Sequence, residues 1–335
     1  MRAARRGPVI AVTMGDPGGI GPEVAVRVSS MPAVRRACRP VVVGDISVLR
    51  KCADLLRARV TFAEAPGIAQ PPLAAGAVPV VNPWKPIRRH RWGVVRAEYG
   101  AAAMAYVRFA ARAALDGRAD GLVTAPICKE AIHLAGYRFQ GHTDYLARLT
   151  GAREHAMMLT GRGLSVVLVT IHVAISGVSR LVTRRSVLRA IRLAHAASRR
   201  MGVRRPRVAV CGLNPHAGEA GAFGREEIEA ISPAVRDAAR EGIDARGPFP
   251  SDTLFVPASR AGFDIVVAMY HDQGLIPLKM LAFDRGVNVT LGLPIVRTSP
   301  DHGTAFDIAG RGIADPGSMA EAMLLAARLC AGRAR

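Results

Sequence analysis

The chain alternates between short apolar runs and longer stretches in which apolar residues recur every three or four positions. The apolar runs predict strands at Val9–Thr13, Pro40–Val43, Gly121–Thr124, Ser165–Thr170, Val208–Gly212, Ile265–Met269 and Val287–Thr290. The periodic stretches predict helices at Pro22–Ser30, Ile46–Leu56, Ala97–Leu115, Ser186–Met201, Glu226–Glu241 and Ser318–Leu329. This alternation is typical of an α/β fold with a largely parallel sheet covered on both faces. The Ala-, Pro- and Gly-rich stretch Ala63–Val80 is expected to be a surface connection.

Several predicted strands end directly in polar or glycine-rich segments. Thr13 runs into MGDPGGIGPE, Gly212 into LNPHAGE and Met269 into YHDQG. Ligands of open α/β sheets bind at the carboxyl ends of the strands, so we expect one site built from several of these loops. MGDPGGIGPE itself allows two interpretations. It is either a phosphate-binding turn at a helix N-terminus or a tight turn with Pro22 at the first helical position.

The charge balance is strongly basic: 46 Lys and Arg stand against 26 Asp and Glu, a formal net charge of +20 over 335 residues. Such a balance is also typical of nucleic-acid-binding proteins. Only four of the basic residues are lysine, however, and the 42 arginines are scattered in ones and twos without interleaved aromatic residues. We therefore interpret the charge as a compositional bias that attracts anionic substrates. A basic nucleic-acid-binding protein is the non-enzymatic alternative.

The sequence contains none of the usual signals for export or membrane insertion. Five scattered cysteines form no CxxC motif, which is typical of reduced thiols in a reducing compartment. The longest apolar runs are strand-length, well short of the roughly 20 residues of a membrane span. The apolar stretch behind the basic N-terminus is too short for a secretion signal. We expect a cytoplasmic protein.

Three of the nine histidines, His172, His216 and His271, follow predicted strands within a few residues. If those strands are parallel neighbours, the three imidazoles project from one edge of the sheet. Three neutral imidazoles with an open position describe a catalytic divalent-metal site, with zinc as the default ion. Their separations of 44 and 55 residues match no local zinc-binding pattern, so the residues alone leave a structural role open as well.

The segment SPDHGTAFDIAGRGIADPGSM, residues 299–319, resembles the adenosine-binding loop of the decarboxylating isocitrate and isopropylmalate dehydrogenases. In that family a similar His-Gly-Ser/Thr-Ala…Asp-Ile-Ala-Gly run holds the adenine and ribose of the cofactor. The resemblance implies NAD or NADP, bound without a Rossmann fingerprint. The cofactor-binding residues it implies are His302, Gly303, Thr304 and Asp307.

Motifs along nearly the whole chain together resemble the 4-hydroxythreonine-4-phosphate dehydrogenases of pyridoxal phosphate biosynthesis and their close relatives. They are TMGDPGGIGPE, TAPICKEAIHLAG, GHTDYLA, NPHAGE, FGREE, GPFPSDT, YHDQGLIPLK and FDRGVNVTLGLPIVRTSPDHGTAFDIAGRG. The resemblance implies an NAD(P)- and metal-dependent oxidation of 4-phosphohydroxy-L-threonine to the 3-oxo acid, which decarboxylates to 3-amino-2-oxopropyl phosphate. It also implies a homodimer with the active site at the subunit interface.

The same resemblance implies roles for individual residues. His172, His216 and His271 match the ligands of the divalent metal, zinc first, with magnesium, manganese and cobalt as alternatives. The residues that match substrate-binding positions are His142, Thr143, Lys279, Asn288 and Arg297. Asp252 and Lys279 are the expected catalytic residues. The group that takes the hydroxyl proton is left open between Asp252, His142 and a metal-bound water.

The sequence departs from the common pattern of this family at a few places. Gln140 and Asp144 stand where Pro and Glu are common around the GHT motif. YHDQGLIPLKMLAF is closer to relatives that act on 4-phospho-D-threonate or 4-phospho-D-erythronate in sugar-acid catabolism. Those acids carry a hydroxyl where phosphohydroxythreonine carries an amine. They, or another diol on the same scaffold, are therefore the alternative substrates.

By analogy with the isocitrate and isopropylmalate dehydrogenases, we expect a two-lobed α/β/α fold with the active site in the cleft between the lobes. Residues 1–135 and 303–335 are expected to form the first lobe. Residues 136–302 are expected to form the second lobe, which carries most of the metal and substrate residues.

Overall fold

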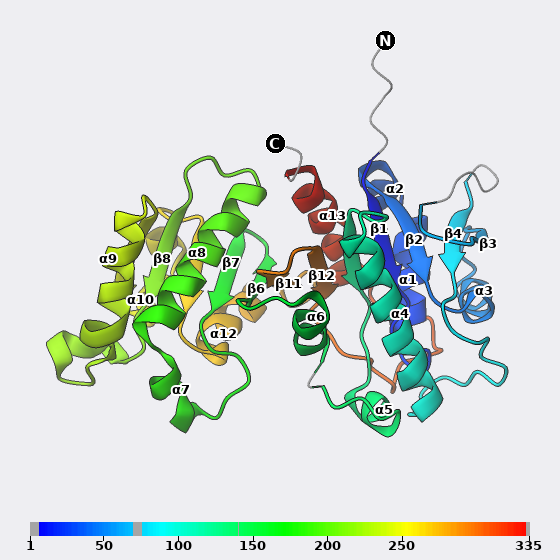
Figure 1. Ribbon diagram of the computed structural model, residues 1–335, viewed down its shortest axis with the longest axis horizontal. Helices are drawn as coiled ribbons and strands as arrows, with labels where there is room; N and C mark the ends of the chain where they lie inside the picture. The colour runs from blue at the N-terminus through cyan, green and yellow to red at the C-terminus, as the bar shows by residue number, and fades with distance from the viewer. Residues whose placement is uncertain (1–6, 70–75, 140, 333–335) are drawn as a thin grey trace, which may run out of the picture. The chain divides into compact units, whose positions relative to one another are not determined.

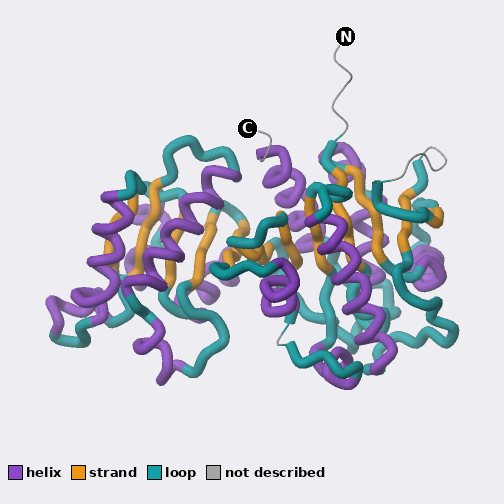
Figure 2. Tube along the Cα trace, viewed as in Figure 1, coloured by secondary structure: helices purple, strands orange, loops and turns teal. Residues whose placement is uncertain are grey.

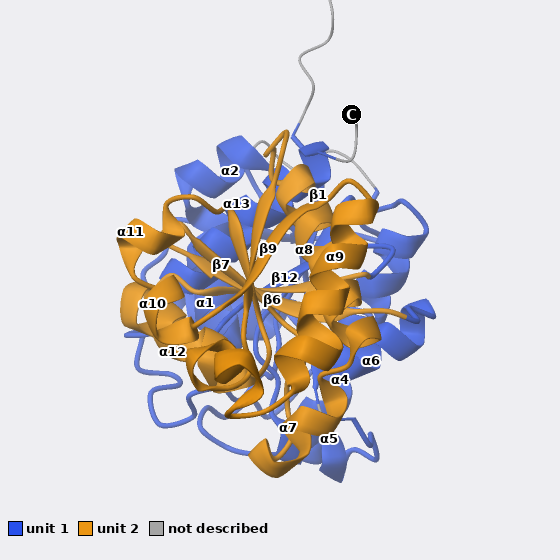
Figure 3. Ribbon diagram, turned by 90° about the vertical axis from the view of Figure 1, so that its left-hand side faces the viewer, with its two compact units in different colours: residues 1–153, 293–335 blue, residues 154–292 orange. Residues whose placement is uncertain are grey.

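The computed structural model describes residues 7–69, 76–139 and 141–332. The chain divides into two compact units, coloured separately in Figure 3: unit 1 comprises residues 1–153 and 293–335, and unit 2 comprises residues 154–292. Each unit is built from strands with helices packed around them (Figure 2), so the predicted α/β fold class is confirmed. None of the helices in the described ranges is long and apolar enough to cross a membrane.

In its described residues, unit 1 holds six parallel strands in the order β3-β4-β2-β1-β5-β12. They are β1 (Val9–Thr13), β2 (Arg39–Val43), β3 (Phe62–Glu64), β4 (Val78–Val81), β5 (Gly121–Thr124) and β12 (Val296–Pro300). The strand β5 is buried along its whole length, and β1 and β2 are buried from their second residue on, because helices cover them.

The helices of unit 1 are α1 (Gly21–Ser30), α2 (Pro32–Ala37), α3 (Ile46–Leu55), α4 (Ala97–Leu115), α5 (Lys129–Leu134), α6 (His142–Thr150) and α13 (Gly317–Ala331). Helix α4 packs on β1, β2 and β5, and α13 packs on β5 and β12 (Figure 1). Tyr99 and Tyr106 of α4 are fully buried in the core of this unit. The carboxyl ends of the strands are left for loops, which is where parallel sheets bind ligands.

In its described residues, unit 2 holds six strands in the order β11-β6-β7-β10-β8-β9. They are β6 (Ala156–Gly161), β7 (Leu164–Leu168), β8 (Arg207–Cys211), β9 (Asp244–Phe249), β10 (Ile265–Ala268) and β11 (Val287–Leu291). β7, β10, β8 and β9 are parallel, whereas β6 runs antiparallel to both β7 and β11. The prediction of a largely parallel arrangement therefore holds, with β6 as the exception.

The helical elements of unit 2 are α7 (Ile175–Leu181), α8 (Arg184–Arg200), a 3₁₀ segment (Pro215–Gly221), a π segment (Glu227–Ile231), α9 (Ser232–Arg240), α10 (Ser251–Leu254), α11 (Pro257–Arg260) and α12 (His271–Ala282). Side chains of a strand alternate between its two faces. Val166 and Leu168 of β7 pack in one core cluster with Leu278 of α12. This packing holds α12 directly beside the strands whose ends carry the candidate site.

Every predicted strand and helix overlaps an observed element, and β1, β5 and α4 have the predicted bounds. The strands β3, β4, β6, β9 and β12 were not predicted. The interpretation of Ala63–Val80 as a connection throughout is wrong at its two ends, because β3 and β4 pair there. Residues 70–75 of that stretch lie outside the described residues.

The chain crosses between the units at 153/154 and 292/293, whereas the expected crossings lay at 135/136 and 302/303. The stretch with α6 belongs to unit 1 because Leu146 and Ala147 are buried in the core of that unit. The stretch with β12 belongs there too, because β12 pairs with β5. His142 and Arg297 consequently lie in unit 1 rather than with the histidines of unit 2.

Candidate active site

A buried arginine reaches the carboxyl end of β5 in unit 1. Arg297 lies on β12 and only 3% of it is exposed. Because β12 pairs with β5, its Nη2 donates to Oγ1 of Thr124 at 2.7 Å and its Nε donates to the same atom at 3.3 Å. Burial lowers the pKa of Arg297, since removing a cation from water costs free energy. An anionic group bound beside the guanidinium would offset that cost.

His142, at the start of α6 in the same unit, has the electronic state expected of a neutral substrate-binding imidazole. Burial, and secondarily the charge of Arg297, lower its pKa well below the usual value, so the ring is uncharged at pH 7. Its Nε2 is inaccessible to water and has no hydrogen-bond partner in the described residues. A neutral imidazole can donate or accept at that atom. Thr143 follows in the first turn of α6, and Gln140 lies outside the described residues.

Two of the predicted metal ligands lie side by side in unit 2. His172 follows β7 and His271 begins α12 directly after β10, and their ring centroids are 5.9 Å apart. They meet because β7 and β10 are paired in parallel, a pairing extended by Thr170, whose Oγ1 donates to the carbonyl of Met269 at 2.8 Å. A cavity of about 400 Å³ is lined by both histidines, with Asp272 and the apolar Ile171 beside them.

His271 is oriented by the residue that follows it. Its Nδ1 donates to Oδ1 of Asp272 at 2.7 Å. A hydrogen bond of this kind fixes the tautomer and leaves Nε2 available as a ligand, the usual arrangement around metal-binding histidines. Asp272 was not singled out from the sequence, although it stands next to a predicted ligand in the YHDQG motif.

His216 lies in a different environment from the other two histidines. It follows β8 in the 3₁₀ segment, at a φ of 53°, and its ring lies 6.2 Å from that of Phe223. Left-handed backbone at a non-glycine residue is strained and concentrates at functional sites. Glu227, which is buried, holds this turn by accepting the N–H of Leu213 at 2.7 Å.

In residues 7–69, 76–139 and 141–332, no group of three His, Cys, Asp or Glu side chains is arranged to hold a metal ion. The structure thus brings together two of the predicted ligands, and the three-histidine site stays a prediction.

Gln273 ties several strand ends of unit 2 together, although sequence reasoning passed over it. Its Oε1 accepts the N–H of Met269 at 2.6 Å, and its Nε2 donates to the carbonyl of Gly212 and to Oγ of Ser251, both at 2.7 Å. These bonds connect the ends of β10 and β8 with α10. Asp252 is the next residue of α10 and is exposed, with its Oδ1 accepting the N–H of Thr253 at 3.0 Å.

The other two predicted substrate residues of unit 2 lie on neighbouring elements of the chain. Lys279 is exposed on α12, two turns after His271. Asn288 lies on β11, and its Oδ1 is buried without a hydrogen-bond partner in the described residues. A buried amide oxygen without a partner is costly, so a ligand that donates a hydrogen bond would stabilise it.

The predicted cofactor residues lie in a segment of unit 1 that forms neither helix nor strand. The carbonyl of Thr304 accepts the N–H of Ile20 at 2.9 Å. His302 has its Nδ1 3.1 Å from the carbonyl of Gly303, and its Nε2 is buried without a partner in the part of the chain described. Asp307 is exposed. These contacts place the segment against the MGDPGGIGPE turn.

The MGDPGGIGPE segment has the geometry of a tight turn that leads into a helix, the second of its two interpretations. Helix α1 begins at Gly21 with Pro22 in its first turn. Oδ1 of the buried Asp16 accepts the N–H of Gly18 at 2.8 Å. Burial raises the pKa of Asp16 to about 6, against the lowering effect of backbone N–H groups of Gly18 and Cys128.

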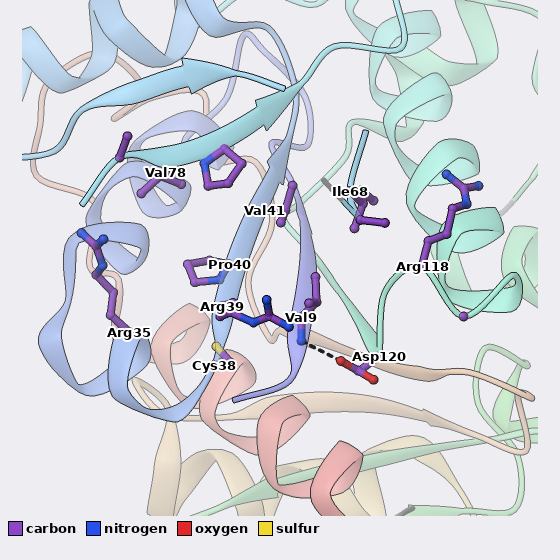
Figure 4. A pocket seen from close by; sticks show the side chains of 14 residues that line it. Val9, Arg35, Cys38, Arg39, Pro40, Val41, Ile68, Val78, Arg118 and Asp120 are labelled. Atoms are coloured by element: carbon purple, nitrogen blue, oxygen red, sulfur yellow. Dashed lines mark hydrogen bonds between the residues drawn. The ribbon is translucent and has the colours of Figure 1, made fainter. Parts of the chain in front are cut away.

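A larger pocket of about 620 Å³ lies at the opposite, amino ends of the unit 1 strands (Figure 4). Its lining includes Val9, Arg39 and Val78, and Asp120, whose Oδ2 accepts the N–H of Val9 at 2.7 Å. None of the predicted site residues lines it. Because ligands of parallel sheets bind at the carboxyl ends, we do not assign the active site to this pocket.

The fold is that of a two-unit α/β protein with polar side chains gathered at the carboxyl ends of its strands. Residues 36–326 match the family described as pyridoxal phosphate biosynthetic protein PdxA. The chain belongs to this family.

Relatives of known name resemble the chain over nearly its whole length. It is 47% identical over 326 residues to a 4-hydroxythreonine-4-phosphate dehydrogenase of Geobacter metallireducens, covering 96% of this chain and 95% of the relative. It is 44% identical over 328 residues to a D-threonate 4-phosphate dehydrogenase of Cupriavidus necator, covering 98% of each. The crystal structure of a 4-hydroxythreonine-4-phosphate dehydrogenase from Klebsiella pneumoniae superposes with a TM-score of 0.88 at 41% identity, covering 98% of this chain and 99% of that one.

Proposed function

We propose that this protein is a dehydrogenase that oxidises the secondary hydroxyl of 4-phosphohydroxy-L-threonine, using NAD or NADP and a divalent metal. The observation that carries the proposal is the 47% identity, over 96% of the chain, to a relative named for that activity. Oxidation gives the 3-oxo acid, which loses CO₂ to leave 3-amino-2-oxopropyl phosphate. The hydride goes to the nicotinamide and the hydroxyl proton goes to a base on the enzyme.

The side chains of unit 1 support binding of an anionic substrate. The guanidinium of Arg297 is buried and is oriented by Thr124, so it can form a bidentate, charge-assisted pair with a phosphate or carboxylate. The neutral His142 offers its buried Nε2 to a substrate hydroxyl. Together they bind and orient the substrate and keep water away from one side of it.

Two imidazoles of unit 2, those of His172 and His271, are spaced like two ligands of one divalent metal. Two imidazoles on one tetrahedral zinc have ring centroids about 5 Å apart, given Zn–N distances of about 2.0–2.1 Å. The 5.9 Å between His172 and His271 is close to that separation, and Asp272 already orients one of the rings. A divalent ion held there supplies the Lewis acidity that lowers the pKa of the substrate hydroxyl, and the nicotinamide supplies the hydride acceptor. The group that takes the proton stays open between Asp252, His142 and a metal-bound water.

We further propose that the ligand set is completed at the interface of a homodimer. Helix α12, which carries His271 and Lys279, presents an exposed apolar face together with Phe283, the residue that follows it: Ile276, Met280 and Phe283 are 59%, 83% and 80% exposed. Apolar patches of this kind mark protein–protein interfaces. A second copy of the chain seated on this face would bring its own side chains next to the candidate metal ligands.

The test is turnover by the purified protein with NAD⁺ or NADP⁺ and added Zn²⁺, Mg²⁺, Mn²⁺ or Co²⁺. We expect reduction of the cofactor on 4-phosphohydroxy-L-threonine, loss of activity after EDTA and recovery when the metal is returned. Full activity in EDTA would refute the requirement for a divalent metal. Retention on DNA with no turnover of any phosphorylated hydroxy acid would favour the nucleic-acid-binding alternative instead.

A second substrate is favoured by the 44% identity to a D-threonate 4-phosphate dehydrogenase. Beside the reacting carbon, 4-phosphohydroxy-L-threonine carries an amine and D-threonate 4-phosphate carries a hydroxyl. Measuring kcat/KM for both substrates under the same conditions decides between them. We expect 4-phosphohydroxy-L-threonine to have the higher value. A higher value for D-threonate 4-phosphate or D-erythronate 4-phosphate would assign the chain to the sugar-acid reaction.

A further inference from the structure

The segment 302–312 has no secondary structure of its own and is held by α1 and by Ile20, the residue before it. Three hydrogen bonds connect them within unit 1. Besides the Ile20 N–H bond to the carbonyl of Thr304, the N–H of Gly310 donates to Oε1 of Glu23 at 2.7 Å. One turn further along α1, Nη2 of Arg27 donates to the carbonyl of Gly312 at 2.5 Å. These bonds hold the segment near its beginning, at Thr304, and near its end, at Gly310 and Gly312.

Glu23 is the most unusual of these anchors because it is a fully buried carboxylate. Its Oε2 is inaccessible and has no hydrogen-bond partner in the described residues. Burying a carboxylate costs free energy unless it is well bonded, and helix α1 would form with an uncharged residue here. Within the described residues, Oε1 of Glu23 accepts a hydrogen bond from the segment 302–312 while Oε2 has no partner, which indicates that holding the segment is the role of this carboxylate.

The other partner in this bond is equally specific. Gly310 has a φ of +79°, and a Cβ on it would lie 2.4 Å from the ring of Trp92. Only glycine turns the backbone here so that its N–H meets Glu23 while the chain passes close to the indole. The packing is tight on the other side as well, since a Cβ on Gly19 would lie 2.7 Å from the carbonyl of Thr304.

We propose that Glu23 is a positioning residue for the nicotinamide cofactor: by holding Gly310 it sets the conformation in which His302, Gly303, Thr304 and Asp307 meet the adenosine part. The inference rests on the proposed function, in which those four residues bind the cofactor. Glu23 acts through the segment and touches neither the substrate nor the reacting atoms. Its removal should therefore weaken the cofactor and leave the substrate site intact.

The test compares Glu23→Ala and Glu23→Gln with wild type, using Glu98→Ala as a matched control, since Glu98 also lies in the first turn of a helix of unit 1. We expect Glu23→Ala to raise KM for the cofactor about tenfold, equivalent to about 1.4 kcal/mol, with kcat and the substrate KM changed less than threefold. Gln keeps an oxygen acceptor for the Gly310 N–H and should restore most of the affinity. Arg27→Met, which removes the neighbouring bond, provides a milder variant that still folds if Glu23→Ala does not.

Hydrogen exchange of the peptide 303–312 gives a readout independent of turnover. Glu23→Ala and Arg27→Met should speed exchange there, and Glu98→Ala should not. Unchanged exchange in both variants would overturn the role of Glu23 in holding the segment. Faster exchange with an unchanged cofactor KM would overturn its role in cofactor binding. A wild-type protein without turnover on any substrate would refute the proposed function itself, and the exchange comparison would still decide whether Glu23 holds the segment.

Discussion

Asp16, in the turn that precedes α1, allows the cost of a buried carboxylate to be measured. Its side chain is completely buried, and its Oδ1 accepts the N–H of Gly18. Burial raises its pKa from 3.8 to about 6. Substitution by Asn keeps an oxygen acceptor for Gly18 and removes the titration. Comparing the two proteins therefore isolates the free energy of charging one buried carboxyl group.

The sign and size of the effect follow from the pKa shift. Between pH 3.8 and about 6 the native carboxyl binds more protons than the unfolded one, so the free energy of unfolding falls as the pH rises through this window. Above it the loss is complete and amounts to about 3 kcal/mol, at about 1.4 kcal/mol for each pKa unit. About 2 kcal/mol of this loss lies between pH 4.5 and pH 7.5.

The assay is urea denaturation of wild type and Asp16→Asn, followed by circular dichroism at several pH values from 4.5 to 7.5. From pH 4.5 to pH 7.5, the free energy of unfolding of Asp16→Asn minus that of wild type should increase by about 2 kcal/mol. A poorly paired Asn amide adds a cost that does not vary with pH, so it shifts the difference without changing its slope. Asp54→Asn, on the exposed face of α3, serves as the control. A difference that is the same at every pH would refute the reasoning.

Three shorter predictions concern the candidate site. Arg297→Lys should raise KM for the phosphorylated substrate tenfold or more, because the loss of a charge-assisted hydrogen bond costs about 1.5–3 kcal/mol; an unchanged substrate KM in steady-state kinetics would argue against an anion at Arg297. His271→Ala should lower the metal content measured by mass spectrometry, whereas His133→Ala, exposed on α5, should not; equal metal content in both would remove His271 from the ligand set. Met280→Asp should turn the proposed dimer into a monomer in light scattering, and a dimeric mass in both proteins would place the interface elsewhere.

The strands that the sequence predicts are those whose own residues are apolar enough to identify them. β5, GLVT, is buried throughout and β1, VIAVT, is buried from its second residue on, so their apolar composition alone indicates them. β6, AMMLTG, carries two methionines in place of β-branched residues and joins β7 through the tight turn at Arg162 and Gly163. β3 has three residues and forms only because β4 pairs with it. Such strands depend on their partners, which the local pattern does not contain.

The grouping of the site residues depends on strand order in the same way. His172 and His271 meet because β7 and β10 are neighbours, although β8 and β9 separate them along the chain. Spacing in the sequence cannot contain that information. His216 follows β8, which is also a neighbour of β10, yet its turn takes a left-handed course held by Glu227. Strand order alone leads to the expectation that all three rings lie at one edge of the sheet. Whether the ring of His216 lies there depends on the conformation of the turn that carries it.

β12 illustrates why functional strands are the hardest to predict. Its sequence, VRTSP, places an arginine, a threonine, a serine and a proline in four of its five buried positions, a composition typical of a loop. The strand forms because β5 provides a paired edge, and Thr124 at the end of that edge provides the oxygen that Arg297 needs. Residues chosen for chemistry weaken the local signal, and the surrounding fold supplies what they lack. The places where pattern-based prediction fails within an otherwise well-predicted sheet are therefore candidates for the site, and β12 is where this chain buries Arg297, the arginine that we propose binds the substrate anion.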